Sequence, residues 1–407
     1  MKFIKIITIF LLAILISFSF IGCNDGTDNL NNGGNNGNDN NSTFNTLVEF
    51  LTSLETLAQS NGSYSYTVKA DETILSNELS YEGKTNITII LSGDNINRTI
   101  SFSPVTAGRM FTVHSGVTLI LGNNLTLAGH EYNSFPLIVI TSGGKLIMNE
   151  GSKITGNTNT SEGGGVVVSS GLGINPSGIF IMNGGEISGN RSGTGGGGVA
   201  ISSGAVFTMN NGKIINNRVT GQMSKYGGGV LVYGTFIMEG GEVSNNTVNA
   251  SYGLVTEANG GGVYVVQSSF TMNGGKITGN TTTSSGTNSI AYGGGVFVNG
   301  SASYPGSFTM TGGEISGNSI SGNSISRGGG VYLDSNTTIT YTKTGGVITG
   351  SDDVIAPNII KNNSGNLQNN NGFAVYLGNP ARRRETTAGT NINMNSNTSG
   401  TEGGWEN

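Results

Sequence analysis

The stretch Gly227–Asn246, GGGVLVYGTFIMEGGEVSNN, contains the three elements that recur along most of the chain. It opens with a glycine run followed by Val-x-Val and continues with Phe-x-Met and two further glycines. It ends with an aliphatic residue three positions before an asparagine. The apolar residues of each element alternate with other residues, a period of two that is typical of β-strands with one buried face. The stretch therefore predicts three short strands separated by glycine turns.

The same unit recurs at a nearly constant step. The first valines that follow successive glycine runs lie 33, 31, 33, 33 and 35 residues apart. The step from the aromatic residue of Phe-x-Met to the next aliphatic residue is always seven, whereas the step onward to the next glycine-run valine varies from 12 to 20. One corner is therefore a tight turn, and another carries loops of variable length. The glycine runs begin at Gly163, Gly196, Gly227, Gly260, Gly293 and Gly328.

Three short strands cannot bury their faces alone, but stacked copies form one continuous core. The repeat resembles the right-handed parallel β-helix, in particular the Gly-Gly-x-Val and Phe-x-Met-Asn-Gly-Gly repeats of bacterial surface lipoproteins. More distantly it is similar to the passenger repeats of polymorphic outer-membrane proteins. The resemblance implies an all-β, right-handed parallel β-helix (solenoid) over residues 60–377, with about nine to eleven coils. Residues 378–407 follow as an irregular C-terminal cap or tail.

An amphipathic helix is predicted over residues 42–59, before the first strands. Its apolar residues recur at helical spacing, and Asn41 or Ser42 is placed to cap its N-terminus. A helix at this position covers the open end of the β stack, which otherwise presents an unpaired edge. The apolar positions are Phe44, Leu47, Val48, Leu51, Leu54 and Ala58.

The recurring asparagine is predicted to form a ladder at one corner, where stacked amides hydrogen-bond from coil to coil. The Phe and Met side chains of the unit then form columns in the interior. After Tyr341 the repeat weakens, and Ser351 stands where the next ladder asparagine is expected. The predicted ladder residues are Asn157, Asn190, Asn217, Asn246, Asn280 and Asn318.

One predicted surface column carries charges that alternate in sign from coil to coil. Opposite signs then face each other on adjacent strands, whereas pairing with the wrong coil at an even offset brings like charges together. We therefore expect this column to favour the correct register. Its members are Lys153, Glu186, Lys213, Glu242, Lys276 and Glu314.

The N-terminus has the pattern of an export signal. Lys2 and Lys5 precede the apolar run Ile6–Ile21, which is too short for a typical membrane span. The single cysteine, Cys23, follows at once and resembles the lipobox of bacterial lipoproteins. The resemblance implies a signal peptide over residues 1–23, lipidation of Cys23, and a membrane anchor at the outer membrane or cell surface. The alternative is a secreted protein with an isolated cysteine. Residues 24–41 are rich in Asn and Gly and are predicted to form a disordered tether.

The composition argues against several function classes. The formal net charge of −5 provides no basic field for nucleic acid. One Cys and two His exclude a disulfide framework and the usual zinc sites, and no nucleotide-binding loop occurs. Enzymes that act on polysaccharides often have this fold, and they are the alternative function. A glycosidase needs two positioned carboxylates, yet the acids of the repeat alternate with lysines. We therefore predict a monomer with no cofactor, metal or catalytic residue.

Between the two inward residues of each glycine-run strand lies one outward residue, and this column turns aromatic toward the C-terminus. Its last four members, Tyr264, Phe297, Tyr332 and Tyr376, are the candidate ligand-binding residues. If exposed, their stacked rings suit a sugar or a partner's side chains. The alternative is that the variable loops 246–259 and 280–291 bury them. The predicted function is a lipid-anchored structural or adhesin-like module that binds a glycan or the host extracellular matrix.

Overall fold

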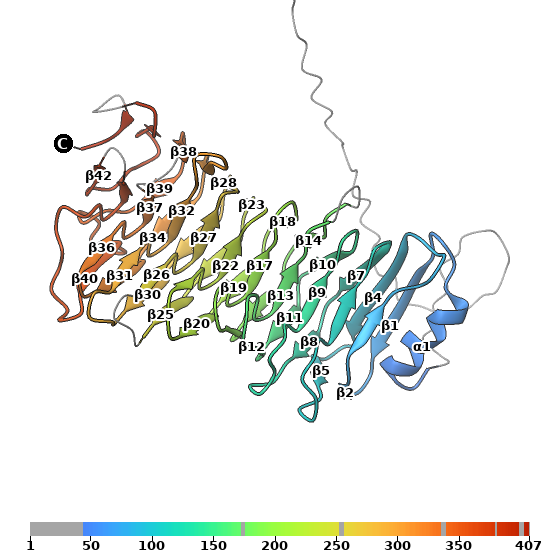
Figure 1. Cartoon of the computed structure of the whole chain (residues 1–407). Helices are drawn as coiled ribbons and strands as arrows, with labels where there is room; N and C mark the ends of the chain where they lie inside the picture. The colour runs from blue at the N-terminus through green and yellow to red at the C-terminus, as the bar shows by residue number, and fades with distance from the viewer. Residues whose placement is uncertain are drawn as a thin grey trace, which may run out of the picture. The chain divides into compact units, whose positions relative to one another are not determined.

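The computed structural model describes residues 44–171, 176–251, 256–334, 339–378, 381–398 and 403–406. These residues form a parallel β-helix preceded by one α-helix, as predicted (Figure 1). Ten of the eleven strands in the longest sheets run parallel to their neighbours, which gives ten coils. The predicted signal segment with Cys23, the tether 24–41 and the predicted caps Asn41 and Ser42 lie outside the described residues.

Each coil contributes strands to three long sheets, and coils from β12 onward add shorter ones. Sheet A contains β1 (Ser63–Val68), β4 (Ile87–Gly93), β7 (Val117–Leu121), β10 (Lys145–Met148), β14 (Ile179–Met182), β18 (Val206–Met209), β23 (Thr235–Met238), β28 (Ser269–Met272), β33 (Gly306–Met310), β38 (Ile339–Lys343) and β43 (Met394–Asn395). Sheet B contains β2 (Glu72–Ile74), β5 (Arg98–Phe102), β8 (Leu125–Ala128), β11 (Ser152–Thr155), β15 (Glu186–Ser188), β19 (Lys213–Ile215), β24 (Glu242–Ser244), β29 (Lys276–Thr278), β34 (Glu314–Ser316) and β39 (Val347–Ile348).

The glycine-run strands form the third long sheet. Sheet C contains β3 (Asn77–Leu79), β6 (Phe111–Val113), β9 (Ile138–Ile140), β13 (Val166–Val168), β17 (Val199–Ile201), β22 (Val230–Val232), β27 (Val263–Val266), β32 (Val296–Asn299), β37 (Val331–Leu333), β41 (Val375–Leu377) and β42 (Arg382–Arg384). Sheet D contains β12 (Thr158–Asn159), β16 (Arg191–Ser192), β20 (Arg218–Gly221), β25 (Thr247–Ala250), β30 (Thr281–Ser284), β35 (Ser319–Gly322) and β40 (Ile359–Asn362). Sheet E contains β21 (Lys225–Tyr226), β26 (Glu257–Asn259), β31 (Ile290–Tyr292) and β36 (Ile325–Arg327).

The interior consists of columns of like residues, one per coil. The phenylalanine rings of sheet A stack face to face from Phe180 to Phe308. The centroids of successive rings are 4.5 to 5.0 Å apart. The methionines two residues later form a second buried column, from Met148 to Met310. Because each column is dry and continuous, every coil packs on the same residue types in its neighbours.

The fixed step of seven residues follows from a glycine turn that admits no side chain. Gly241 has φ +81°, and a Cβ there would lie 2.7 Å from the Met209 Cε of the preceding coil. The left-handed conformation and the close approach of the coils both require glycine. The corner between sheets A and B therefore keeps the same length in successive repeats.

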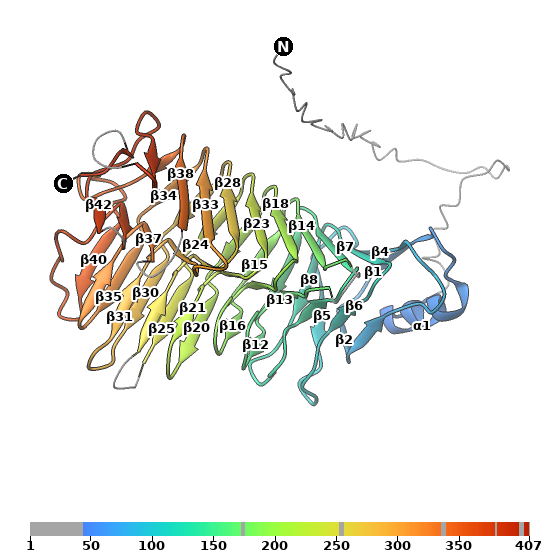
Figure 2. The same cartoon turned by 45° about the horizontal axis from the view of Figure 1, so that its top comes forward.

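Helix α1 (Leu47–Leu57) lies at the β1 end of the stack (Figures 1 and 2). Its N-cap is Thr46, whose Oγ1 accepts a hydrogen bond from the Glu49 N–H at 3.2 Å. The cap predictions of Asn41 and Ser42 placed the start of the helix too early. The Phe50 ring stacks on Tyr66 of β1 at 5.3 Å, whereas Val48, which was predicted to face the core, is exposed. The buried face of the helix therefore includes Phe50 in place of Val48.

The C-terminal segment folds back over the opposite end. Strand β43 pairs with β38, and β42 pairs with β41, both in antiparallel register. Trp405 is buried with its ring 6.3 Å from Tyr341. Lys343 occupies the methionine position of the last coil and donates hydrogen bonds to the carbonyls of Gly389 and Ile392 at 2.7 and 2.9 Å. Burial, together with the charge of Arg384, lowers the pKa of Lys343 to about 8.

The variable corner differs from the sequence-based prediction of loops. Within residues 246–259 and 280–291, strands β25, β26, β30 and β31 pair in register with their equivalents in adjacent coils. These segments of neighbouring coils lie side by side, so their backbone N–H and C=O groups hydrogen-bond to one another as in a β-sheet. Small buried clusters, one of which contains Val248 and Ala258, lie between sheets D and E.

Candidate functional site

The six predicted ladder asparagines are buried at one corner of the helix. The Asn217 backbone N–H and Nδ2 both donate to Asn246 Oδ1, at 2.9 and 3.1 Å. Asn246 repeats this pattern with Asn280 Oδ1, at 3.0 Å for both bonds. The second Nδ2 hydrogen of each amide reaches a strand carbonyl, such as that of Ile214 at 2.8 Å. Every polar group of these amides is therefore paired, and the ladder is structural rather than reactive.

The ladder extends beyond the predicted members. Asn318 donates to Asn358 Oδ1 at 2.9 and 3.0 Å, so Asn358, not Ser351, takes the last position. At the other end Asn133 donates to Asn157 Oδ1 at 2.9 Å. The segment after β39 is longer than the usual corner, which shifts the asparagine away from its sequence spacing.

The charged column lies in register on the outer face of sheet B. Lys153 pairs with Glu186, Glu186 with Lys213, and so on to Glu314, as Cα partners on adjacent strands. Ion pairs join Lys153 to Glu186 at 2.8 Å and Lys276 to Glu314 at 3.2 Å. Because these side chains are partly exposed, each pair contributes at most about 1 kcal/mol. The arrangement is consistent with a register device.

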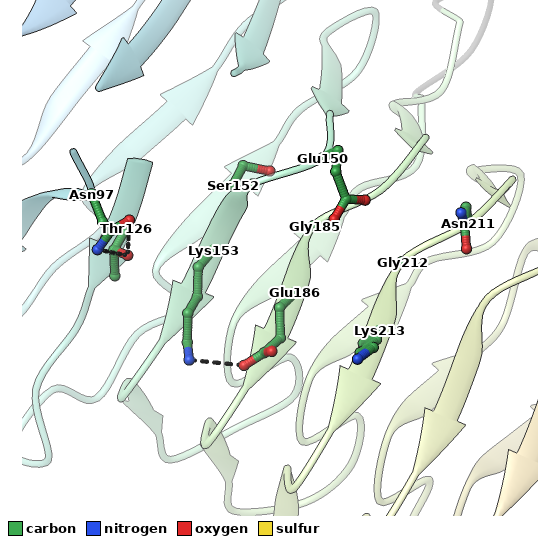
Figure 3. A pocket seen from close by; sticks show the side chains of 11 residues that line it. Asn97, Thr126, Glu150, Ser152, Lys153, Gly185, Glu186, Asn211, Gly212 and Lys213 are labelled. Carbon is green, nitrogen blue, oxygen red and sulfur yellow. Dashed lines mark hydrogen bonds and ion pairs between the residues drawn. The ribbon is translucent and has the colours of Figure 1, made fainter. Parts of the chain in front are cut away.

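A polar groove of about 510 Å³ lies over the start of this column (Figure 3). Two carboxylates, Glu150 and Glu186, line it together with Lys153 and Lys213. Burial by itself raises the pKa of Glu186, but the hydrogen bonds from Lys153 and Ser188 outweigh it and bring the pKa below its usual value. Glu186 is therefore ionised at neutral pH, which suits a base or an electrostatic role. Further polar lining comes from Asn97, Thr126, Ser152 and Asn211.

The aromatic column does not present its ring faces to solvent. Tyr264, Phe297, Tyr332 and Tyr376 are between 1 and 7 % exposed, so the expectation that they offer faces to a ligand is wrong. Neighbouring rings stack on one another at 4.9, 5.2 and 5.7 Å. The column is therefore a second, outer core.

The alternative, in which the variable corner buries the column, is confirmed, and the covering groups are the last residues of strands β21, β31 and β36 of sheet E. In three coils the residue before the glycine run contacts the column ring of the next coil. Tyr226 stacks on Tyr264 at 4.9 Å, and Tyr292 on Tyr332 at 4.2 Å. Arg327 follows the same rule, with its guanidinium 4.9 Å from the Tyr376 ring. These residues occupy one position in register, with Asn259 between Tyr226 and Tyr292, so the cover follows the repeat but is interrupted at one coil.

Three half-buried tyrosines remain at the surface of this face: Tyr226, Tyr233 and Tyr292, which we call the tyrosine rim. The Tyr233 hydroxyl donates to Glu162 Oε1 at 3.0 Å, across two coils. Burial raises the pKa of Tyr233, and the charge of Glu162 raises it further. Because Tyr226 and Tyr292 use a ring face for stacking and Tyr233 packs against the same cluster, the rim offers ring edges and hydroxyl groups beside Glu162 and Arg327.

The sequence contains a signal for the rim, the residue immediately before the glycine run, which the spacing of the repeat alone does not reveal. Tyr226, Tyr292 and Arg327 each stand immediately before a glycine run, a fixed position in the repeat. That position belongs to the variable corner, for which no strand was predicted. The candidate site therefore shifts from the buried column to its cover.

Comparison of the chain with protein-family models, with curated proteins and with solved structures gives no match. Within the residues that the structure describes, no group of three or more His, Cys, Asp or Glu is placed to hold a metal ion. Among the same residues no helix is long and apolar enough to cross a membrane.

Proposed function

We propose that the protein is a lipid-anchored binding module of the cell surface, which attaches to a glycan or to host extracellular matrix through the tyrosine rim. The observation that carries the proposal is the geometry of the rim. Tyr226 and Tyr292 are fixed by ring stacking on a buried column and Tyr233 by its hydrogen bond to Glu162, so the three phenols lie in set positions near a carboxylate and a guanidinium.

Such a surface combines two properties of binding faces. Tyr and Arg are enriched at interfaces because they supply a large contact area and hydrogen bonds with few rotatable bonds. Rigid placement before binding also reduces the entropy lost on association. The repeated coils provide a scaffold that needs no reactive group, and the same scaffold hosts many unrelated functions.

The rim is tested with the triple variant Tyr226→Phe/Tyr233→Phe/Tyr292→Phe, which keeps every ring and removes only the hydroxyls. On a panel of polysaccharides and matrix proteins, we expect the affinity of purified full-length protein to fall at least about tenfold. The melting temperature should change little. Tyr341→Phe, which removes a buried hydroxyl far from this face, is the matched control and should bind normally. Unchanged binding by the triple variant refutes the role of the rim.

Export and anchoring form the second part of the proposal, and they rest on the sequence of residues 1–23. Replacing the proposed lipidated residue, Cys23→Ser, should move the protein from the membrane fraction to the soluble fraction, because a single anchor is lost. Asn24→Ser, at the adjacent position, should stay with the membrane. Persistent membrane association of the Cys23→Ser protein would contradict the anchor.

A polysaccharide-active enzyme is the second candidate function, and the groove in Figure 3 is the observation that favours it. A glycosidase needs one ionised and one protonated carboxyl group across the scissile bond. Glu186 supplies an ionised carboxylate, and Glu150 is the second carboxyl group that lines the groove. Glu150→Gln and Glu186→Gln should each abolish turnover if this function is correct.

A further inference from the structure

The outer face of sheet D carries one column in which two adjacent coils have arginine. At the first outward position, four of the seven strands have a hydroxyl residue and β40 has Ile359, whereas β16 and β20 have Arg191 and Arg218. The hydroxyl residues are Thr158, Thr247, Thr281 and Ser319. Threonine is thus the most frequent residue at this position, and it is the natural replacement for either arginine in a variant.

The two arginines are direct register partners on adjacent parallel strands, and both side chains are exposed. Adjacent strands are about 4.8 Å apart, so the guanidinium stems leave the sheet side by side. Among the described residues, neither guanidinium has an ion pair or a side-chain hydrogen bond. Like charges facing each other on neighbouring strands are unfavourable. A bound anion between them removes that repulsion.

The neighbouring surface suits a sugar polymer. On the two strands that follow β20, the outward positions of sheet D are neutral and polar: Thr247 and Asn249 on β25, and Thr281 and Thr283 on β30. Hydroxyl and amide groups on a flat sheet can hydrogen-bond to successive sugars. A nucleic acid, with a charge on every nucleotide, would find an outward cation on only three of the seven strands of sheet D, at Arg191, Arg218 and Lys361.

We propose that Arg191 and Arg218 form an anion-binding fork for the carboxylate or sulfate groups of an acidic polysaccharide, whose chain extends along sheet D toward β30. Guanidinium groups bind both anions through paired N–H···O bonds. This inference rests on the proposed binding function and names its ligand class. It places the acidic group on sheet D, a different surface from the tyrosine rim.

The test compares full-length protein with Arg191→Thr/Arg218→Thr, which restores the residue that the column carries elsewhere. The probes are polygalacturonate, dextran sulfate, neutral dextran and inorganic sulfate at about 0.15 M salt. We expect the intact protein to bind one or both acidic polymers and to bind dextran much more weakly. The double variant should lose at least about tenfold in affinity for those polymers, with an unchanged melting temperature. Competition by inorganic sulfate should be weak, because it replaces one contact of a polymer.

Charge alone is controlled with Lys69→Thr/Arg109→Thr, which removes two exposed cations outside sheet D and should bind as the intact protein does. Equal losses in both double variants, or no loss in Arg191→Thr/Arg218→Thr, overturn the fork. If the intact protein binds dextran or a matrix protein but neither acidic polymer, and the tyrosine-rim variant alone loses this binding, the fork is overturned and the binding function stands. Absence of binding to any probe or panel member by the intact protein contradicts both.

Discussion

Replacing Asn246 by alanine should destabilise the folded body by about 3–5 kcal/mol. Asn246 Oδ1 accepts two hydrogen bonds from Asn217, and its Nδ2 donates to Ile214 and Asn280. Truncation leaves several of these groups buried without partners, and each such group costs about 1–3 kcal/mol. The shift in the urea unfolding midpoint measures the effect.

Asn249→Ala provides the matched control, because Asn249 lies on the next strand, β25, with an exposed side chain. Its replacement should change stability by no more than about 0.5 kcal/mol. Equal midpoints for the two variants would show that the ladder does not stabilise the corner.

The Phe236→Ala variant should lose a similar amount of stability, about 3–5 kcal/mol, for a different reason. Phe236 is fully buried, and its ring lies 4.9 Å from Phe207 and 4.8 Å from Phe270. Removing it opens a cavity in a continuous column that the neighbouring coils cannot close without losing their own register. Thermal unfolding of the variant should begin at a lower temperature.

Ile237→Ala, on the same strand with its side chain directed outward, should cost much less, because this side chain is only half-buried. Phe236→Leu should fall between the two, since it keeps apolar volume and loses ring stacking. A free energy of unfolding for Phe236→Ala within about 1 kcal/mol of that of the unmodified protein is incompatible with a tightly packed column.

The constant parts of the repeat made the fold predictable. The step of seven residues fixes the corner between sheets A and B, because Gly241 and its equivalents admit no Cβ. The periodic Phe, Met and Asn then define columns without further information. Strands of sheets D and E escaped prediction because segments such as Thr281–Ser284 lack apolar alternation. Their pairing comes from neighbouring coils, a long-range effect that local sequence does not encode.

The candidate site was only partly predictable, for the same reason. The outward position of Tyr264 and its equivalents follows from strand periodicity. Its burial depends on Tyr226 and Tyr292, which belong to a corner whose path varies in length. The helix shows a smaller error of this kind: Phe50 rather than Val48 faces the first coil, since the packing of one end decides which face of an amphipathic helix is buried.

Binding without cleavage is the central claim for this protein, and one measurement addresses it directly. Purified full-length protein is incubated with the polysaccharide and matrix panel, and both retention on each ligand and the release of new chain ends are recorded. We predict retention that depends on the tyrosine rim, with polymer length unchanged over many hours. Release of new chain ends that disappears in the Glu150→Gln and Glu186→Gln variants would contradict the account and identify the groove over sheet B as an active site.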